Sequence, residues 1–133
     1  MARANKKGWE GEKRLCELLE QATGLKWFST PSQEMSKKTR FGDCNPIPRQ
    51  EGLDKCVLQG FMFDAQKADK LTPVLKLKKL QDDMKLGGTA HGVYFGEETS
   101  GTGTPNLEII AMTAKDFVYI IRWLQEYHNE HGI

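Results

Sequence analysis

Apolar residues recur at helical spacing near the amino terminus of this 133-residue chain. Leu15, Leu18 and Leu19 fall on one face of a helix with a period of about 3.6 residues. Gly24 follows this stripe, and glycine commonly ends a helix because it readily adopts the left-handed backbone conformation. The pattern therefore predicts a helix over residues 7–23.

A long polar segment separates this helix from the most apolar part of the chain. Residues 25–30 are a short strand candidate, and residues 31–52 are rich in Pro, Ser, Lys, Arg and Gly, which predicts a long loop. A loop of this length within one domain is usually functional or mobile. Residues 55–66 then predict two strands or one bent strand, with Gly60 at the break.

Helical and strand patterns alternate in the second half of the chain. Residues 72–88 predict a helix, residues 89–96 and 106–113 predict strands, and a helix capped by Thr113 covers residues 114–128. The order α-β-loop-β-β-α-β-β-α connects strands through both hairpins and helices. It predicts one α/β or α+β domain in three layers, with a central mixed β-sheet flanked by helices.

Composition and charge narrow the class of protein. The chain is 38% apolar and 28% charged, as globular domains are, and its formal net charge of +1 shows no overall basicity. Cys16, Cys44 and Cys56 form no Cys-x-x-Cys pair and no Cys/His cluster, which predicts reduced thiols without a disulfide framework or zinc site. No apolar run has the length of a membrane span and no hydrophobic leader is seen, so we expect a soluble, cytoplasmic protein.

The apolar strand predicted at residues 61–63 ends abruptly in polar residues. Asp64 and Gln66 share one face of a regular strand, whereas Lys67 points to the other face. A carboxylate at a strand end, together with the backbone carbonyl of Ala65, suits a hard divalent cation such as Mg²⁺. The alternative is a strand that simply reaches solvent at this point.

Further acids are candidates for the same site. Asp54 precedes the strand, and a hairpin-like arrangement would bring it beside Asp64. Asp43, in a turn-like sequence, is the reserve candidate. Glu12 lies on the apolar stripe of the first predicted helix, where a carboxylate needs a partner or a metal ion. Alternatively, Glu12 lies in the first turn of that helix and complements the helix dipole.

These segments together resemble the PD-(D/E)XK nuclease superfamily, most closely the Holliday-junction resolvases of the archaeal and RecU-like bacterial and phage type. That family has an early helix with a Gly, a Glu and a basic residue, a strand acid, an apolar run ending in (D/E)-x-K, and a polar helix before a Gly pair and an apolar strand. The matching positions, in chain order, are Gly8, Glu12, Lys13, Asp54, Phe63, Asp64, Ala65, Gln66, Gln81, Gly87, Gly88, Val93, Tyr94 and Phe95. The resemblance spans roughly residues 8–96 and rests on short motifs.

The resemblance implies a restriction-endonuclease-like fold and metal-dependent hydrolysis of DNA. It implies that Glu12, Asp54 and Asp64 bind Mg²⁺, or alternatively Mn²⁺, with the Ala65 carbonyl as a further ligand. It also implies a homodimer, because a four-way junction needs two symmetric cuts. Two other functions stay open: a catalytically impaired DNA-binding module on the same fold, and a restriction- or repair-type nuclease that cuts duplex or flap DNA.

Gln66 departs from the family pattern, in which a catalytic lysine occupies this position. An amide can hydrogen-bond a water molecule but carries no charge. Gln66 itself could position the attacking water, or Lys67 could reach the site through a β-bulge. A lysine of the next helix, Lys76 or Lys78, could also replace the motif lysine. The fourth outcome is loss of catalysis with retention of DNA binding.

Clusters of basic residues bracket the candidate acids in sequence. Such clusters bind DNA phosphates, although the alternative for any lysine run is a solvated surface. A basic N-terminal arm covers residues 1–7. The other residues predicted to contact DNA are Lys37, Lys38, Arg40, Arg49, Lys67, Lys70, Lys76, Lys78 and Lys79.

Overall fold

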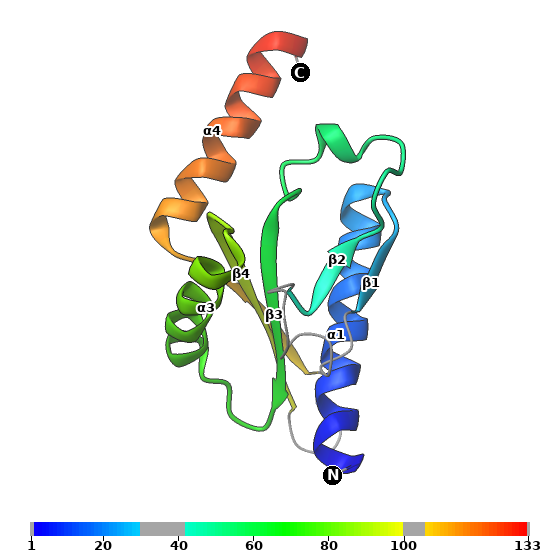
Figure 1. Cartoon of the computed structure of the whole chain (residues 1–133), viewed down its shortest axis with the longest axis vertical. Helices are drawn as coiled ribbons and strands as arrows, with labels where there is room; N and C mark the ends of the chain where they lie inside the picture. The colour runs from blue at the N-terminus through cyan, green and yellow to red at the C-terminus, as the bar shows by residue number, and fades with distance from the viewer. Residues whose placement is uncertain (1, 30–41, 100–105, 133) are drawn as a thin grey trace.

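The computed structural model describes residues 2–29, 42–99 and 106–132, and the side chains from Trp9 onward within these ranges. Its helices are α1 (Ala2–Thr23), α3 (Pro73–Gly87) and α4 (Ala114–His131), with a short 3₁₀ helix, η1, at Leu53–Lys55. Its strands are β1 (Trp27–Ser29), β2 (Cys44–Pro46), β3 (Phe61–Ala68), β4 (His91–Glu98) and β5 (Leu107–Ala111). The predicted mixed α/β class is confirmed, since a mixed sheet lies between helices (Figure 1).

The main sheet has the strand order β3-β4-β5. β3 and β4 are parallel, in register from Phe61 opposite His91 to Ala68 opposite Glu98, and α3 makes the crossover between them. β4 and β5 are antiparallel, and β1 and β2 form a separate antiparallel ribbon. Within the described chain β3 is therefore an edge strand of the main sheet.

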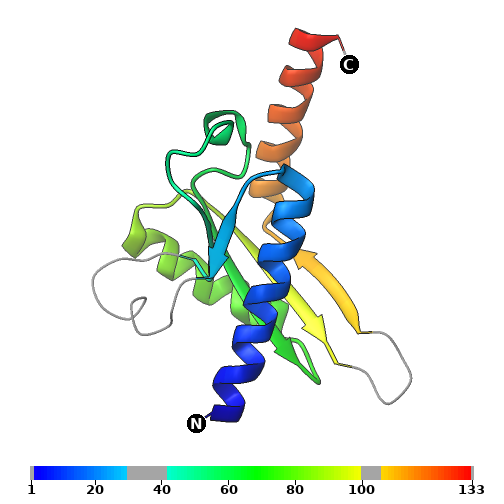
Figure 2. The same cartoon turned by 90° about the vertical axis from the view of Figure 1, so that its right-hand side faces the viewer.

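Both faces of the main sheet are covered, which explains the continuous apolar run at the start of β3. Phe61 and Phe63 pack with Leu15 of α1, whereas Met62 points to the opposite face and packs with Leu80 of α3. Figure 1 shows α3 and α1 on opposite sides of the sheet, and Figure 2 shows α1 crossing one face. The polar side chains that follow along β3 alternate between these same two faces.

The segment before β3 differs from the prediction. Residues 53–55 form η1 and residues 57–60 form turns, so this described segment contains no strand. Gly52 and Gly60 have left-handed backbone conformations, with φ of 90° and 85°, which bend the chain at both ends of the segment. Local bonds, such as the one from the Lys55 N–H to the Gly52 carbonyl, satisfy the peptides between them. Asp54 therefore does not open a strand.

A disulfide joins Cys16 of α1 to Cys44 of β2, with a Cα–Cα distance of 6.0 Å. The prediction of three reduced thiols is therefore wrong, although Cys56 is free. Sequence patterns could not predict this pair, because the two cysteines are 28 residues apart and β2 lies inside the segment predicted as a loop. The bridge ties the helix that carries Glu12 to the strand that directly follows Asp43.

Breaking the Cys16–Cys44 bridge is expected to lower stability. In the chain-entropy account a cross-link over this separation stabilises a fold by about 3–4 kcal/mol, because it restricts the unfolded chain. We expect Cys16→Ser to lower the free energy of unfolding by that amount in urea titrations, and a reductant to do the same to the wild type. Cys56→Ser, which removes the free thiol, is the control. Equal unfolding free energies for Cys16→Ser and the oxidised wild type would contradict a stabilising bridge.

The first turns of α4 are fixed to the start of β4. The predicted N-cap is confirmed, since the Thr113 hydroxyl accepts a hydrogen bond from the Asp116 N–H. The Asp116 carboxylate is buried, accepts from the Gly92 N–H at 3.2 Å and lies 2.7 Å from His91 Nδ1. The C-terminal turns of α4 extend beyond the sheet (Figure 2). In the part of the chain that is described, no helix is both long and apolar enough to cross a membrane.

Candidate active site

Asp43 lies beside Asp64, at the edge of β3 that does not pair with β4. The Asp43 N–H donates a hydrogen bond to the Phe63 carbonyl at 2.6 Å, and Asp43 Oδ2 accepts one from the Ala65 N–H at 2.7 Å. Gly42 permits this close approach, because a Cβ atom there would lie 2.4 Å from the Phe63 nitrogen. The carboxyl groups of Asp43 and Asp64 then hydrogen-bond to each other.

The pKa values of both aspartates are raised. Burial, followed by the nearby charge of Asp64, raises the pKa of Asp43 to about 8. Burial also raises the pKa of Asp64, and the positive charge of Lys76 opposes that rise. A hydrogen bond between two carboxyl groups needs one proton, and the raised pKa values of both aspartates favour a pair that keeps one.

Glu12 extends this pair from α1. Burial raises the pKa of Glu12 to about 7, and the charge of Asp64 adds to the rise. Glu12 in turn contributes to the raised pKa of Asp43. The three side chains, from α1, the residue before β2, and β3, thus lie within electrostatic reach of one another, and we call them the acid cluster. Groups with strongly shifted pKa values are enriched at functional sites.

Asp54 lies outside the acid cluster. It is exposed on η1, and it is not among the groups that chiefly shift the pKa values of the cluster. The prediction that a hairpin brings Asp54 to Asp64 is wrong, because β3 pairs with β4 on one side and is met by Asp43 on the other. The reserve candidate, Asp43, is therefore the acid that lies beside Asp64.

Gln66 follows Asp64 by two residues on β3, but its amide is already engaged. Its Oε1 accepts hydrogen bonds from the Tyr94 hydroxyl at 2.6 Å and from the Thr72 N–H at 3.1 Å. Its Nε2 donates to Thr72 Oγ1 at 3.1 Å. Burial, and then the charge of Asp64, raise the pKa of Tyr94 to about 12, so the hydroxyl stays a donor at neutral pH. Gln66 thus fastens β3 to β4 and to the start of α3.

No sequence pattern singled out Thr72 or Tyr94 as partners of Gln66. Tyr94 is opposite Asp64 in the parallel register of β3 and β4, and this register depends on the α3 crossover. A tyrosine within an apolar strand is otherwise typical of a core position.

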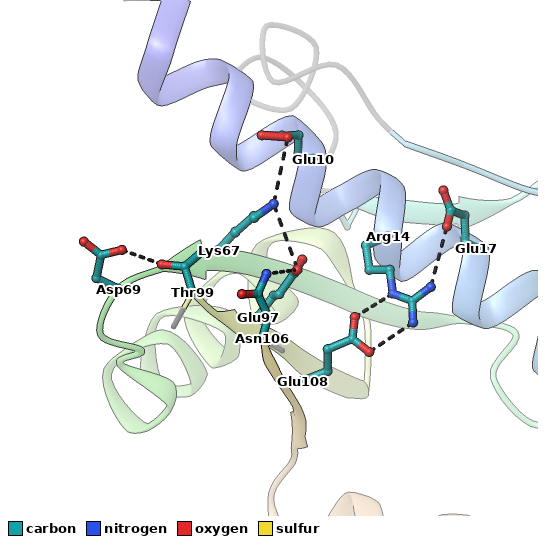
Figure 3. Close-up of polar contacts among 9 residues, drawn as sticks. All are labelled: Glu10, Arg14, Glu17, Lys67, Asp69, Glu97, Thr99, Asn106 and Glu108. Carbon is teal, nitrogen blue, oxygen red and sulfur yellow. Dashed lines mark hydrogen bonds and ion pairs between the residues drawn. The ribbon is translucent and has the colours of Figure 1, made fainter. Parts of the chain in front are cut away.

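Lys67 points away from the acid cluster. β3 continues to Ala68 in unbroken register with β4, so Lys67 lies on the face that α1 covers. Its Nζ lies 3.8 Å from a Glu10 carboxylate oxygen and 4.0 Å from one of Glu97 (Figure 3). The predicted route by which a β-bulge would bring Lys67 to the site is therefore wrong.

Apart from Lys67, the residues predicted to contact DNA fall into three groups. The first lies outside the described residues, as do the side chains of residues 1–7, and comprises Lys37, Lys38 and Arg40. The second is exposed to solvent and comprises Arg49, Lys70 and Lys78. Lys76 is half-buried, and its charge lowers the pKa of Asp64, as does the charge of Lys79. Among the described residues, Lys76 and Lys79 of α3 are the basic side chains with the largest effects on the pKa of Asp64.

The acid cluster offers only carboxylate oxygens, which are the ligands that Mg²⁺ prefers. As the side chains stand, no three His, Cys, Asp or Glu residues in the described ranges converge tightly enough to hold a metal ion. Asp43 and Asp64 are in hydrogen-bond contact, whereas Glu12 is linked to them only through charge: Asp64 raises the pKa of Glu12, and Glu12 raises that of Asp43. Glu12 would have to approach the aspartates, or act through water, to complete a ligand set. Ala65 holds Asp43 through its N–H, and the use of its carbonyl as a ligand stays a prediction.

Comparisons with known proteins do not assign the chain to a family. No family model matches the sequence, and neither a curated protein nor a solved structure matches the chain. The functional argument therefore rests on the acid cluster and the side chains around it.

The raised pKa values of the acid cluster make stability depend on pH. An acid whose pKa is higher in the folded than in the unfolded chain contributes stability while protonated, and this contribution is lost as pH rises through the folded pKa. For Glu12 and Asp43, with pKa values of about 7 and about 8, the loss runs from about pH 4 to pH 8. Without divalent ions we expect Tm to fall over this range by about 4 °C or more, the shift that ~1 kcal/mol produces in a domain of this size.

The control for this pH profile is Asp43→Asn, which removes the carboxyl group whose pKa is raised to about 8. Its Tm should vary less between pH 5 and pH 8 than that of the wild type. Thermal unfolding followed by circular dichroism measures both profiles. A wild-type Tm that stays constant or rises over the range would contradict the raised pKa values.

Proposed function

We propose that this chain is a Mg²⁺-dependent DNA endonuclease with a restriction-endonuclease-like fold, and that it resolves four-way DNA junctions. The acid cluster is the observation that carries the proposal. Burial raises the pKa values of all three carboxyl groups, and the charge of Asp64 adds to the rise at Glu12 and Asp43, so a divalent cation would relieve a real electrostatic cost. The order Glu12, Asp43, Asp64 also keeps the order of acids in the PD-(D/E)XK pattern, with Asp43 in the place first given to Asp54.

The chain's own groups suggest how such a site would work. Asp43 and Asp64 would release their shared proton and act as ligands, while the Ala65 N–H holds the Asp43 carboxylate in place at 2.7 Å. Glu12 would add a third ligand directly or through water. Mg²⁺, or Mn²⁺ in its place, supplies a Lewis acid that polarises the phosphate and lowers the pKa of a bound water. Hydrolysis joins the water oxygen to phosphorus and breaks the bond to the 3′-oxygen, which leaves a 5′-phosphate and a 3′-hydroxyl.

The proposed partner is branched or duplex DNA in the cytoplasm. The exposed side chains of Arg49, Lys70 and Lys78 are available to its phosphates. The proposed active form is a homodimer, because resolution of a four-way junction needs two symmetric cuts.

A catalytically impaired DNA-binding module is the second candidate. The observation in its favour is Gln66, whose amide is held by Thr72 and Tyr94 and carries no charge. In such a module the acid cluster would remain, but no side chain would supply the positive charge that the motif lysine provides in the PD-(D/E)XK family.

Cleavage assays with three DNA substrates separate these functions. We expect the wild type with Mg²⁺ to cut a labelled four-way junction in preference to a flap and a linear duplex, and Asp64→Ala or EDTA to abolish cutting. Equal cutting of all three substrates would replace the resolvase with a restriction- or repair-type nuclease. Junction binding without cutting of any substrate would overturn the nuclease and favour the DNA-binding module.

A further inference from the structure

The side of α3 that packs on the sheet carries a lysine, Lys76, near its N-terminal end. α3 runs antiparallel to β3 and β4, because it connects two parallel strands. Its buried Leu80 packs with Met62 of β3, and a Cβ atom at Gly92 would lie 2.9 Å from Leu80. Lys76 is four residues, about one helical turn, before Leu80, and so lies about 6 Å closer to the N-terminus of α3 on the same face.

A step of similar length along β3 leads from Met62, which packs with Leu80, to Asp64. Two residues of a strand span about 6.6 Å, and residues two apart point to the same face. α3 and β3 run in opposite directions. The step back along α3 from Leu80 to Lys76 and the step forward along β3 from Met62 to Asp64 therefore have the same direction. Lys76 therefore lies over Asp64, on the face of the sheet that α3 covers.

Contacts further along confirm this alignment. Thr72, which precedes α3, is bonded to Gln66, the residue that follows Asp64 by two on β3. The Lys76 N–H donates to the Thr72 carbonyl at 3.0 Å, so the first turn that carries Lys76 begins at the residue that Gln66 holds. Gln66 thereby acts as a positioning residue for Lys76.

Charge interactions agree with this geometry. Among neighbouring charges, Lys76 has the largest lowering effect on the pKa of Asp64, ahead of Lys79. Lys78 is exposed and has no such effect among the leading causes. Of Lys76 and Lys79, Lys76 is the half-buried one, and it therefore faces the acid cluster from the opposite direction to Glu12.

We propose that the ammonium group of Lys76 is a catalytic group that binds a non-bridging oxygen of the scissile phosphate, in place of the motif lysine that Gln66 does not supply. This inference rests on the proposed nuclease function. The role of the Lys76 ammonium group is to offset the negative charge that builds up on the phosphate oxygens when the water attacks. A fixed cation on α3 would do this without contributing a metal ligand.

Three variants test the role of Lys76: Lys76→Gln, Lys76→Arg and the matched control Lys85→Gln, at an exposed lysine in the last turn of the same helix. Single-turnover cleavage of the four-way junction with Mg²⁺ is measured for each. Removal of one such donor typically slows an enzyme by about 100-fold or more, and we expect that loss for Lys76→Gln. We expect Lys76→Arg to restore most of the rate and Lys85→Gln to cut as the wild type does.

Mn²⁺ binding, measured by isothermal titration calorimetry, distinguishes catalysis from support of the fold. Lys76→Gln removes a positive charge beside the acid cluster, so we expect it to bind Mn²⁺ at least as tightly as the wild type. Equal cleavage by Lys76→Gln and Lys85→Gln would overturn the inference and leave the nuclease intact. Weakened Mn²⁺ binding by Lys76→Gln would also overturn it, since a positioning role alone would then explain the loss. A wild type that cuts no DNA would contradict both the nuclease function and the catalytic role of Lys76.

Discussion

Replacement of Asp43 with asparagine is expected to slow DNA cleavage by about 1,000-fold or more, the effect of losing several kcal/mol of transition-state stabilisation. The side chain keeps its size and can still accept the Ala65 hydrogen bond, but it loses the charge that would bind a cation. Single-turnover cleavage of a labelled junction with Mg²⁺ measures the rate.

Asp54→Asn is the matched control for Asp43→Asn. It removes an equal charge from the residue that the sequence pattern favoured, yet Asp54 is exposed on η1. We expect this variant to cut as the wild type does. A larger loss for Asp54→Asn than for Asp43→Asn would show that the acid cluster is not the active centre.

The second large effect is expected for Gly42→Ala. A Cβ atom there would lie 2.4 Å from the nitrogen and 2.7 Å from the oxygen of Phe63, so Asp43 must move away from the edge of β3. Overpacking of this kind lowers the free energy of unfolding by about 1–3 kcal/mol. Because the displaced residue is Asp43, we expect cleavage to fall with stability, as measured by urea unfolding and by junction cutting.

Gly24→Ala separates the two consequences of Gly42→Ala. Gly24 has a φ of 74° and nothing near its missing Cβ, so alanine there introduces backbone strain far from a close contact. We expect this control to lose stability but to keep its cleavage rate under conditions where it is folded. Full activity and unchanged stability in Gly42→Ala would contradict the close packing of Asp43 on β3.

Elements with strong local periodicity were predictable from sequence. The helix predicted at residues 7–23 ends where α1 ends, and the one predicted at residues 72–88 corresponds to α3 at Pro73–Gly87. Each combines an apolar stripe with a terminal glycine, so local propensity and packing agree. The strands at β4 and β5 were likewise found, because turn-rich segments bound their apolar runs.

The position of Asp43 depended on contacts that local patterns do not carry. β2 is three residues long and ends in a proline, so its segment has the composition of a loop. What brings it to β3 is the bond from Asp43 to Phe63, the close approach at Gly42 and the disulfide to α1. These contacts join residues about 20 or more positions apart, which a single sequence without an alignment cannot reveal.

Asp64 and Glu12 were found from sequence for different reasons. Asp64 breaks an apolar strand, and strand alternation is a short-range property that survives in the fold. Glu12 lies on the apolar stripe of α1, which faces the sheet, and a carboxylate in that position is conspicuous. The engagement of Gln66 by Tyr94 could not be foreseen, because it depends on the parallel register of β3 and β4.

Mn²⁺ binding to the wild type and to Asp64→Asn, titrated by calorimetry at pH 8, tests the acid cluster most directly. At this pH the shared proton of Asp43 and Asp64 is readily displaced, since the pKa of Asp43 is about 8. We expect the wild type to bind Mn²⁺ and Asp64→Asn to bind it at least about 10-fold more weakly. Loss of a group that only supports the ligands of a metal site already weakens binding by about 10-fold, so loss of a ligand should cost at least as much. Equal Mn²⁺ affinities for the two proteins, or no binding by the wild type, would contradict a metal site at Glu12, Asp43 and Asp64.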